Sequence, residues 1–179
     1  MVKLEFVKCC VDVNFQEDDG STPLHLAAEH GHLEVSRMLL DHNAEVDAMY
    51  EHGYAPLLKG SASGNLDIVQ LLLDNNANAH VHDNEGSSAL HLAASCGLLE
   101  TTRILLGLNV DVNSRDNSGS TPFLRALTSG NPDVAQSLLD HIAAVHVRDE
   151  NYPVYGNVVW SPRSSSNNPR VQCRDQRQR

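Results

Sequence analysis

The stretch STPLHLAAEHGH, from Ser21 to His32, decides the fold of this chain because the chain keeps returning to it. The glycine that introduces the stretch recurs every 33 residues, at Gly20, Gly53, Gly86 and Gly119. A fixed period of this length indicates a supersecondary unit that stacks on copies of itself, since one unit alone cannot bury its apolar face. The composition agrees, because only 4% of the 179 residues are aromatic. An extended stack needs fewer large core residues than a single globular core.

The repeated motif is also specific in its residue types. A 33-residue period that carries Thr-Pro-Leu-His is the spacing of ankyrin repeats, so the sequence resembles the ankyrin-repeat family over roughly residues 2–151. The resemblance implies an all-α solenoid whose helix-turn-helix units are joined by β-hairpin-like fingers. The expected units are an N-terminal half repeat at 1–16, full repeats at 17–49, 50–82, 83–115 and 116–148, and a degenerate fifth repeat start with a disordered basic tail at 149–179.

Local signals place two helices in each unit. Thr22 can cap the first helix, with Pro23 at its first position, where the missing N–H costs nothing. An asparagine follows the second helix in three units, at Asn43, Asn76 and Asn109. Asparagine tolerates the left-handed backbone that closes a helix. Ile142 in the fourth unit and Cys10 in the half unit lack this property, so we expect looser helix ends at both extremes.

Two cations interrupt the apolar pattern of the first helices. Lys59 and Arg125 stand where Leu26 and Leu92 stand in the other units. We expect their alkyl stems to lie along the seam between units while their charges reach water. The first helices of the second and fourth units therefore depart most from the repeat pattern.

Charge is divided unevenly along the chain. Residues 1–151 carry 8 Lys and Arg against 22 Asp and Glu, a balance of −14, whereas residues 152–179 carry 5 against 1, a balance of +4. An acidic body argues against nucleic-acid binding, which needs a basic stripe to displace counterions from phosphates. The chain has no run of 18 apolar residues, and residues 1–10 lack the apolar centre of a signal peptide.

The cysteines indicate a reducing compartment. The four cysteines show no paired spacing, and the neighbours Cys9 and Cys10 are poorly placed to bridge each other. We therefore expect the protein in the cytoplasm, with the nucleus as the other compartment. We also expect a monomer that does not associate with membranes.

The histidines and serines do not form a catalytic or metal-binding pattern. The family resemblance assigns His25 and His91 to hydrogen bonds that tie the repeat turn together. His80 and His82 lie close together on an expected finger, but no third ligand at metal spacing accompanies them. Residues 60–64, Gly-Ser-Ala-Ser-Gly, resemble an active-serine motif, yet the repeat register explains them better. We expect no enzyme activity, no metal and no cofactor.

The resemblance implies a concave binding groove, formed by the fingers and the exposed face of each first helix. The second finger is its strongest part, because tyrosines that are exposed on a binding surface often dominate the binding energy. The alternative is that these tyrosines are ordinary drifted turn residues. The predicted contact residues are Glu29, His30, Met49, Tyr50, His52, Tyr54, His82, Asn84, Glu85, Arg115 and Asn117.

Three residues are candidate modification sites. Asn14 and Asn113 each end an Asp-Val-Asn run, which in similar ankyrin proteins can be a substrate for β-hydroxylation. Other residues hold the equivalent positions in the remaining units, namely Asp47, His80 and His146, which argues against modification of the whole array. Ser161 begins a Ser-Pro-Arg sequence that suits a proline-directed kinase.

The sequence favours non-catalytic protein binding through an acidic concave face, with a partner that presents Lys or Arg around an apolar anchor. One alternative is the targeting fragment of a larger ankyrin-containing signalling enzyme or ubiquitin-ligase adaptor. Another is a degenerate member of an expanded repeat family that has no specific partner. In the tail, the apolar residues concentrate at Tyr155, Val158, Val159 and Trp160, which can dock on the open end of the fourth unit.

Overall fold

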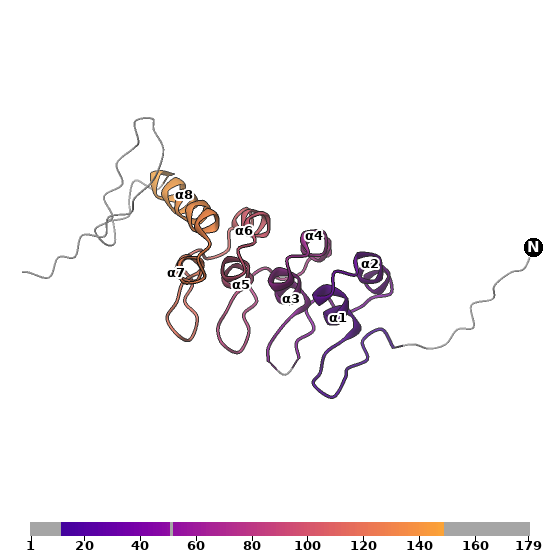
Figure 1. The fold of residues 1–179 in the computed structure, drawn as a ribbon. Helices are drawn as coiled ribbons and strands as arrows, with labels where there is room; N and C mark the ends of the chain where they lie inside the picture. Colours follow the sequence, from indigo (N-terminus) through magenta and orange to yellow (C-terminus); the bar gives the residue numbers. More distant parts are fainter. Residues whose placement is uncertain (1–11, 51, 149–179) are drawn as a thin grey trace, which may run out of the picture.

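The computed structural model describes residues 12–50 and 52–148, and the described residues contain eight helices. These are α1 (Pro23–Glu29), α2 (Leu33–Asp41), α3 (Pro56–Ser63), α4 (Leu66–Asp74), α5 (Ala89–Ser95), α6 (Leu99–Leu106), α7 (Pro122–Thr128) and α8 (Pro132–Arg148). They form an inner row of α1, α3, α5 and α7 beside the fingers, and an outer row of α2, α4, α6 and α8 behind it (Figure 1). Extended pairing within the described ranges is limited to an isolated antiparallel bridge between His82 and Ser88. The predicted all-α solenoid is confirmed.

The helices are held in place by stacking on their neighbours. Inner helix α1 packs against α3, α3 against α5 and α5 against α7. Leu24, Leu57 and Leu90 occupy the same position in successive units and are 0%, 0% and 1% exposed. Helices of seven to nine residues, such as α1 to α7, are marginal in isolation. Their stability therefore comes from apolar burial between units.

The ends of the outer helices follow the sequence prediction in three units. Asn43, Asn76 and Asn109 have φ angles of 63°, 63° and 55°, in the left-handed region. In the fourth unit the expected looser helix end is wrong, because α8 continues through Ile142 to Arg148 and contains 17 residues. A β-branched residue pays a high steric cost for positive φ, so the helix continues where the other three turn. Cys10 lies outside the described residues.

The two cations of the inner row have acidic partners that the sequence prediction did not include, and the side chains of Lys59 and Arg125 remain 21% and 35% exposed. Lys59 Nζ lies 3.2 Å from a Glu29 carboxylate oxygen. Arg125 Nε donates to Asp116 Oδ2 at 2.8 Å, and the Asp116 side chain is fully buried. Burial opposes the charge on Asp116, but hydrogen bonds from Ser118 and Arg125 outweigh it and hold the pKa of this carboxyl well below its ordinary 3.8.

The motif histidines connect each unit to the next. The Nε2 atom of His25 lies 2.9 Å from the carbonyl oxygen of Tyr54, which can only accept, so Nε2 carries the proton. Its Nδ1 then accepts the backbone N–H of Thr22 at 3.1 Å. His91 repeats the arrangement between the N–H of Ser88, at 3.2 Å, and the carbonyl of Ser120, at 3.1 Å. The predicted hydrogen-bonding role of both histidines is confirmed, and each reaches the following finger.

The buried histidines predict a pH-dependent stability. Burial is the main cause that lowers the pKa of His25 and His91 below the ordinary 6.5. The folded protein therefore binds fewer protons than the unfolded chain near pH 6, and the free energy of unfolding falls as the pH drops from about 7 to about 5. Denaturant unfolding across this range measures the slope. The His25→Leu/His91→Leu variant, which copies the buried Leu58, should have a shallower slope, and an unchanged slope would contradict the assignment.

A buried hydroxyl predicts a stabilising substitution. Thr102 on α6 is 0% exposed, and its hydroxyl has no hydrogen-bond partner among the described residues. The equivalent residue on α4 is Val69, also 0% exposed, so a valine fits this position. Thr102→Val should raise the free energy of unfolding by about 1 kcal/mol, as measured in urea. The control is Thr128→Val, because the exposed Thr128 hydroxyl donates to Leu124; a gain of equal size there would contradict the explanation.

Candidate functional site

The fingers of the second, third and fourth units lie side by side and are joined by backbone hydrogen bonds. The N–H of Asn84 donates to the carbonyl of His52 at 3.0 Å, and the N–H of Asn117 donates to that of Glu85 at 2.8 Å. Gly53 sits at this junction with a φ of 74°, and a Cβ there would lie 2.5 Å from Asn84 Oδ1. Only glycine fits this position. The predicted contact residues of the three fingers are thus held in one row.

Two tyrosines, a lysine and a glutamate meet at the base of the second finger, and we name them the tyrosine–lysine cluster: Tyr50, Tyr54, Lys59 and Glu29. The Tyr50 and Tyr54 rings are stacked, with centroids 5.8 Å apart and planes inclined by 25°. Lys59 Nζ lies 5.4 Å from the Tyr50 centroid and 5.2 Å from that of Tyr54. Both distances allow cation–π attraction. The finger, α3 and α1 each contribute to the cluster.

Neighbouring imidazoles fix the position of Tyr50 further. His25 meets the Tyr50 ring edge-on with centroids 5.0 Å apart, and His52 does so at 6.2 Å. Because His25 is itself bonded to the Tyr54 carbonyl at 2.9 Å, the two tyrosines and the end of α1 form one connected arrangement. Such aromatic contacts favour one ring orientation over others.

The cluster has fixed charge states at neutral pH. Burial is the main cause that raises the pKa of Tyr54 above its ordinary 10.0. Burial lowers the pKa of Lys59, but Tyr50 and Glu29 outweigh it and the net pKa lies above the ordinary 10.5. The phenol of Tyr54 is therefore neutral and the ammonium of Lys59 charged. A general acid or base needs a pKa near the working pH, whereas the pKa values of Tyr54 and Lys59 both lie above their ordinary values. These properties suit a contact surface with a constant charge.

The structure brings some of the predicted contact residues together and leaves others apart. Glu29, Tyr50 and Tyr54 meet around Lys59, which the sequence prediction did not include, and His52 contacts the Tyr50 ring. A cation at a position where two other units have leucine was the available signal. The remaining predicted residues lie nearby or on the next two fingers: Met49, which is 52% exposed, and His82, Asn84, Glu85, Arg115 and Asn117. His30, at the end of α1, is exposed and faces His32 with ring centroids 6.0 Å apart.

The acidic residues lie on the fingers, on the loops and on the outer helices, whereas the inner helices are close to neutral, so an acidic concave face stays a prediction that depends on the fingers. The described inner helices carry one acid, Glu29, and two bases, Lys59 and Arg125. The described outer helices carry three bases, Arg37, Arg103 and the terminal Arg148, against seven acids: Glu34, Asp41, Asp67, Asp74, Glu100, Asp133 and Asp140. Four of these acids begin an outer helix, where they stabilise the positive end of its dipole. Helix formation accounts for these four acids.

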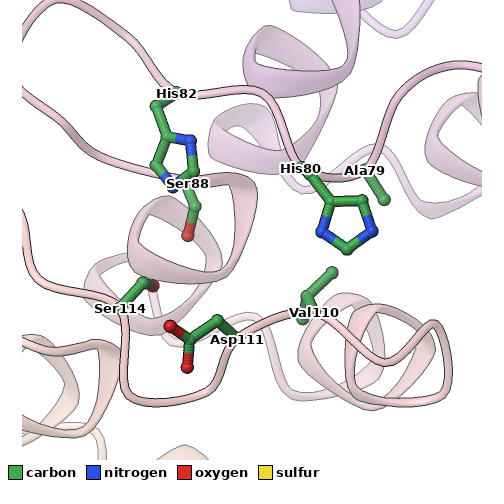
Figure 2. Close-up of a pocket in the computed structure, with 7 residues that line it drawn as sticks. All are labelled: Ala79, His80, His82, Ser88, Val110, Asp111 and Ser114. Carbon is green, nitrogen blue, oxygen red and sulfur yellow. The ribbon is translucent and has the colours of Figure 1, made fainter.

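A small pocket of about 40 Å³ lies between two successive inter-unit loops (Figure 2). His82 lies at its Ser88 end and His80 at its Val110 end, with Asp111 on the opposite loop (Figure 2). These side chains do not converge on one point. Across the described residues, no group of three His, Cys, Asp or Glu side chains could hold a metal ion.

The candidate modification sites differ in accessibility. The Asn14 side chain accepts the N–H of Glu45 at 2.8 Å and donates to the carbonyl of Asn43 at 3.4 Å. Asn113 is exposed, and only its backbone N–H is engaged, with Asp111 Oδ1 at 2.9 Å. Asn113 is therefore the more accessible of the two predicted hydroxylation sites, and modification stays a prediction. Ser161 lies outside the described residues.

Comparison with known protein families agrees with the geometry. A model of ankyrin repeats in three copies matches residues 1–83 and again residues 57–149. The chain belongs to the ankyrin-repeat family. Ankyrin repeats are generally protein–protein interaction modules and are typically non-catalytic. No curated protein matches the chain. None of the helices in the described ranges combines the length and the apolar composition that a membrane span requires.

The tyrosine–lysine cluster predicts a measurable coupling between Lys59 and Tyr50. A double-mutant cycle of Lys59→Met and Tyr50→Leu should give a coupling free energy of about 0.5–1 kcal/mol in favour of the native pair. Urea unfolding of the four proteins provides the measurement. Tyr50→Phe is the matched control, because it keeps the ring and should keep most of the coupling. Zero coupling between Lys59 and Tyr50 would contradict the cation–π assignment.

Proposed function

We propose that this ankyrin-repeat protein binds a partner protein through its concave face, with the tyrosine–lysine cluster and Met49 as the principal contact. The observation that carries the proposal is the stacked pair Tyr50 and Tyr54, which is partly buried at the base of a finger beside the 52% exposed Met49. Aromatic side chains that are already ordered lose little conformational entropy on binding. Such residues commonly supply most of the affinity of an interface.

The chemistry of the cluster supports a partner with an apolar anchor. Met49 offers a flexible and polarisable apolar surface, and the Tyr50 and Tyr54 rings extend it toward α3. Glu29 keeps its side chain 41% exposed while it pairs with Lys59, so a lysine or arginine of the partner can share this carboxylate. Glu85 on the next finger is a second exposed acid. The proposed partner segment therefore presents an apolar side chain flanked by a basic one.

The net charge supports fast association with a basic partner even though the inner helices are close to neutral. Residues 1–151 carry a formal balance of −14, and charge of this size steers oppositely charged partners over long distances. We include a reducing compartment, the cytoplasm or nucleus, in the proposal. Cys96 is exposed with a free thiol, and the other three cysteines lie outside the described residues.

A peptide-display selection on the full chain tests the proposal. Selected peptides should carry a Lys or Arg next to a large apolar residue, and their association rate should fall as salt rises. Tyr50→Ala or Tyr54→Ala should weaken the selected peptides by about 30-fold, the loss expected at a hot spot of about 2 kcal/mol. Isothermal titration calorimetry measures the affinity, and circular dichroism checks that each variant is folded.

A methionine pair provides the matched control for the display experiment. Met49→Ala removes the exposed methionine beside the cluster, whereas Met38→Ala removes one on α2 that is 60% exposed. The first should weaken binding and the second should not. Peptides whose affinity falls with Met38→Ala but not with Met49→Ala or Tyr50→Ala would place binding on another face and overturn the proposal.

A further inference from the structure

The fourth unit exposes a face that its predecessors bury. Leu124 on α7 is 43% exposed, whereas the equivalent His25, Leu58 and His91 are 1%, 0% and 1% exposed. Leu127 is 51% exposed. Its equivalents, Ala28, Ser61 and Ala94, are all 0% exposed. In the first three units the following inner helix covers these positions, since α1, α3 and α5 each pack against the next inner helix.

The path of α8 prevents a further unit from covering this face in the usual way. Residues 110–115 of the third unit leave the outer row and lead to the next finger, but the equivalent residues 143–148 continue α8 as a helix to Arg148. The turn that the other units make at Asn43, Asn76 and Asn109 is missing at Ile142. Leu124 and Leu127 therefore need a different cover, because exposed apolar surface of this kind favours association.

We propose that residues 155–160, Tyr-Gly-Asn-Val-Val-Trp, fold back and cover Leu124 and Leu127 at the C-terminal side of α7. This inference concerns a different face from the proposed partner-binding surface and goes beyond it. The segment contains the chain's single tryptophan, Trp160, and lies in the most apolar part of residues 149–179. Beyond Trp160 the sequence is rich in Ser, Asn, Arg and Gln and offers little other apolar surface.

The length of the intervening chain permits this contact. α7 and α8 are joined by the short turn 129–131, so α8 runs back alongside α7. The last eleven residues of α8 rise about 16 Å, and packed helices lie about 8–10 Å apart. The seven-residue step from Arg148 to Tyr155 spans up to about 24 Å when extended. Tyr155 can therefore reach the level of Leu124 on α7.

Charge and chain connection both favour this occupant over a separate molecule. Residues 152–179 carry a balance of +4 against −14 for residues 1–151, so the tail is attracted to the body of its own chain. A tethered segment also acts at a high effective concentration, of millimolar order for a short linker. The main competitor is a second copy, whose exposed Val35 and Met38 on α2 form an uncovered face at the opposite side of the stack.

Trp160 makes the proposal directly measurable in the full chain. In the wild-type protein, Trp160 emission should be blue-shifted and protected from acrylamide relative to the isolated peptide 149–179, independently of protein concentration. Leu127→Asp should abolish both the shift and the protection. Because Leu127 is half-exposed, this substitution should leave the helices folded. Circular dichroism checks that they are. Met38→Asp is the matched control and should leave Trp160 unchanged.

Other results would overturn the proposal. A wild-type Trp160 as exposed as in the peptide would show that the segment does not dock. A blue shift that grows with protein concentration and is lost in Met38→Asp would assign the face to a second copy. If Leu127→Asp disturbs the helices, Val158→Asp/Val159→Asp replaces it, with hydrogen exchange of the α7 amides as the readout. Exchange should become faster in this tail variant, and unchanged exchange would refute the docking.

Discussion

The inner helices α1, α3 and α5 each complete their burial on the inner helix of the following unit. Leu24, Leu57 and Leu90 are almost fully buried because a neighbour covers them, and helices of this length are marginal alone. The hydrogen bonds of His25 and His91 to the next finger add directional contacts to this apolar seam. The stack therefore behaves as a series of dependent neighbours, and its end faces carry most of the uncovered apolar surface.

The repeat period made much of the fold predictable because special backbone positions demand particular residue types. Glycine at the finger turns and asparagine after the outer helices both have positive φ, which few other residues tolerate. The path of α8 was not predicted, since the absence of asparagine at Ile142 shows only that the turn is disfavoured. Whether the chain then frays or extends as a helix depends on the following residues and their packing.

The tyrosine–lysine cluster was predictable only in part. Tyr50 and Tyr54 stood out as aromatic residues on a finger, but Lys59 looked like an isolated departure from the leucine pattern. Its partners come from two other elements, Glu29 on α1 and the rings of the finger. A repeat pattern gives the position of a residue within its own unit, whereas the contact between Lys59 and Glu29 crosses the boundary between the first and second units. Arg125 differs in this respect, because its partner, the buried Asp116, belongs to the same unit.

The asparagines with positive φ make the turns after the first three outer helices equivalent to one another. Asn43, Asn76 and Asn109 direct the chain through the same turn, so an additional 33-residue copy placed after Asn76 would meet matching neighbours on both sides. Gene duplication inside the array would thus preserve the architecture. The continuous helix through Ile142 lacks this turn, so duplication is disfavoured after the fourth unit. Freed from fitting a successor, that unit has room to diverge, as Leu124 and Leu127 already do from their buried counterparts.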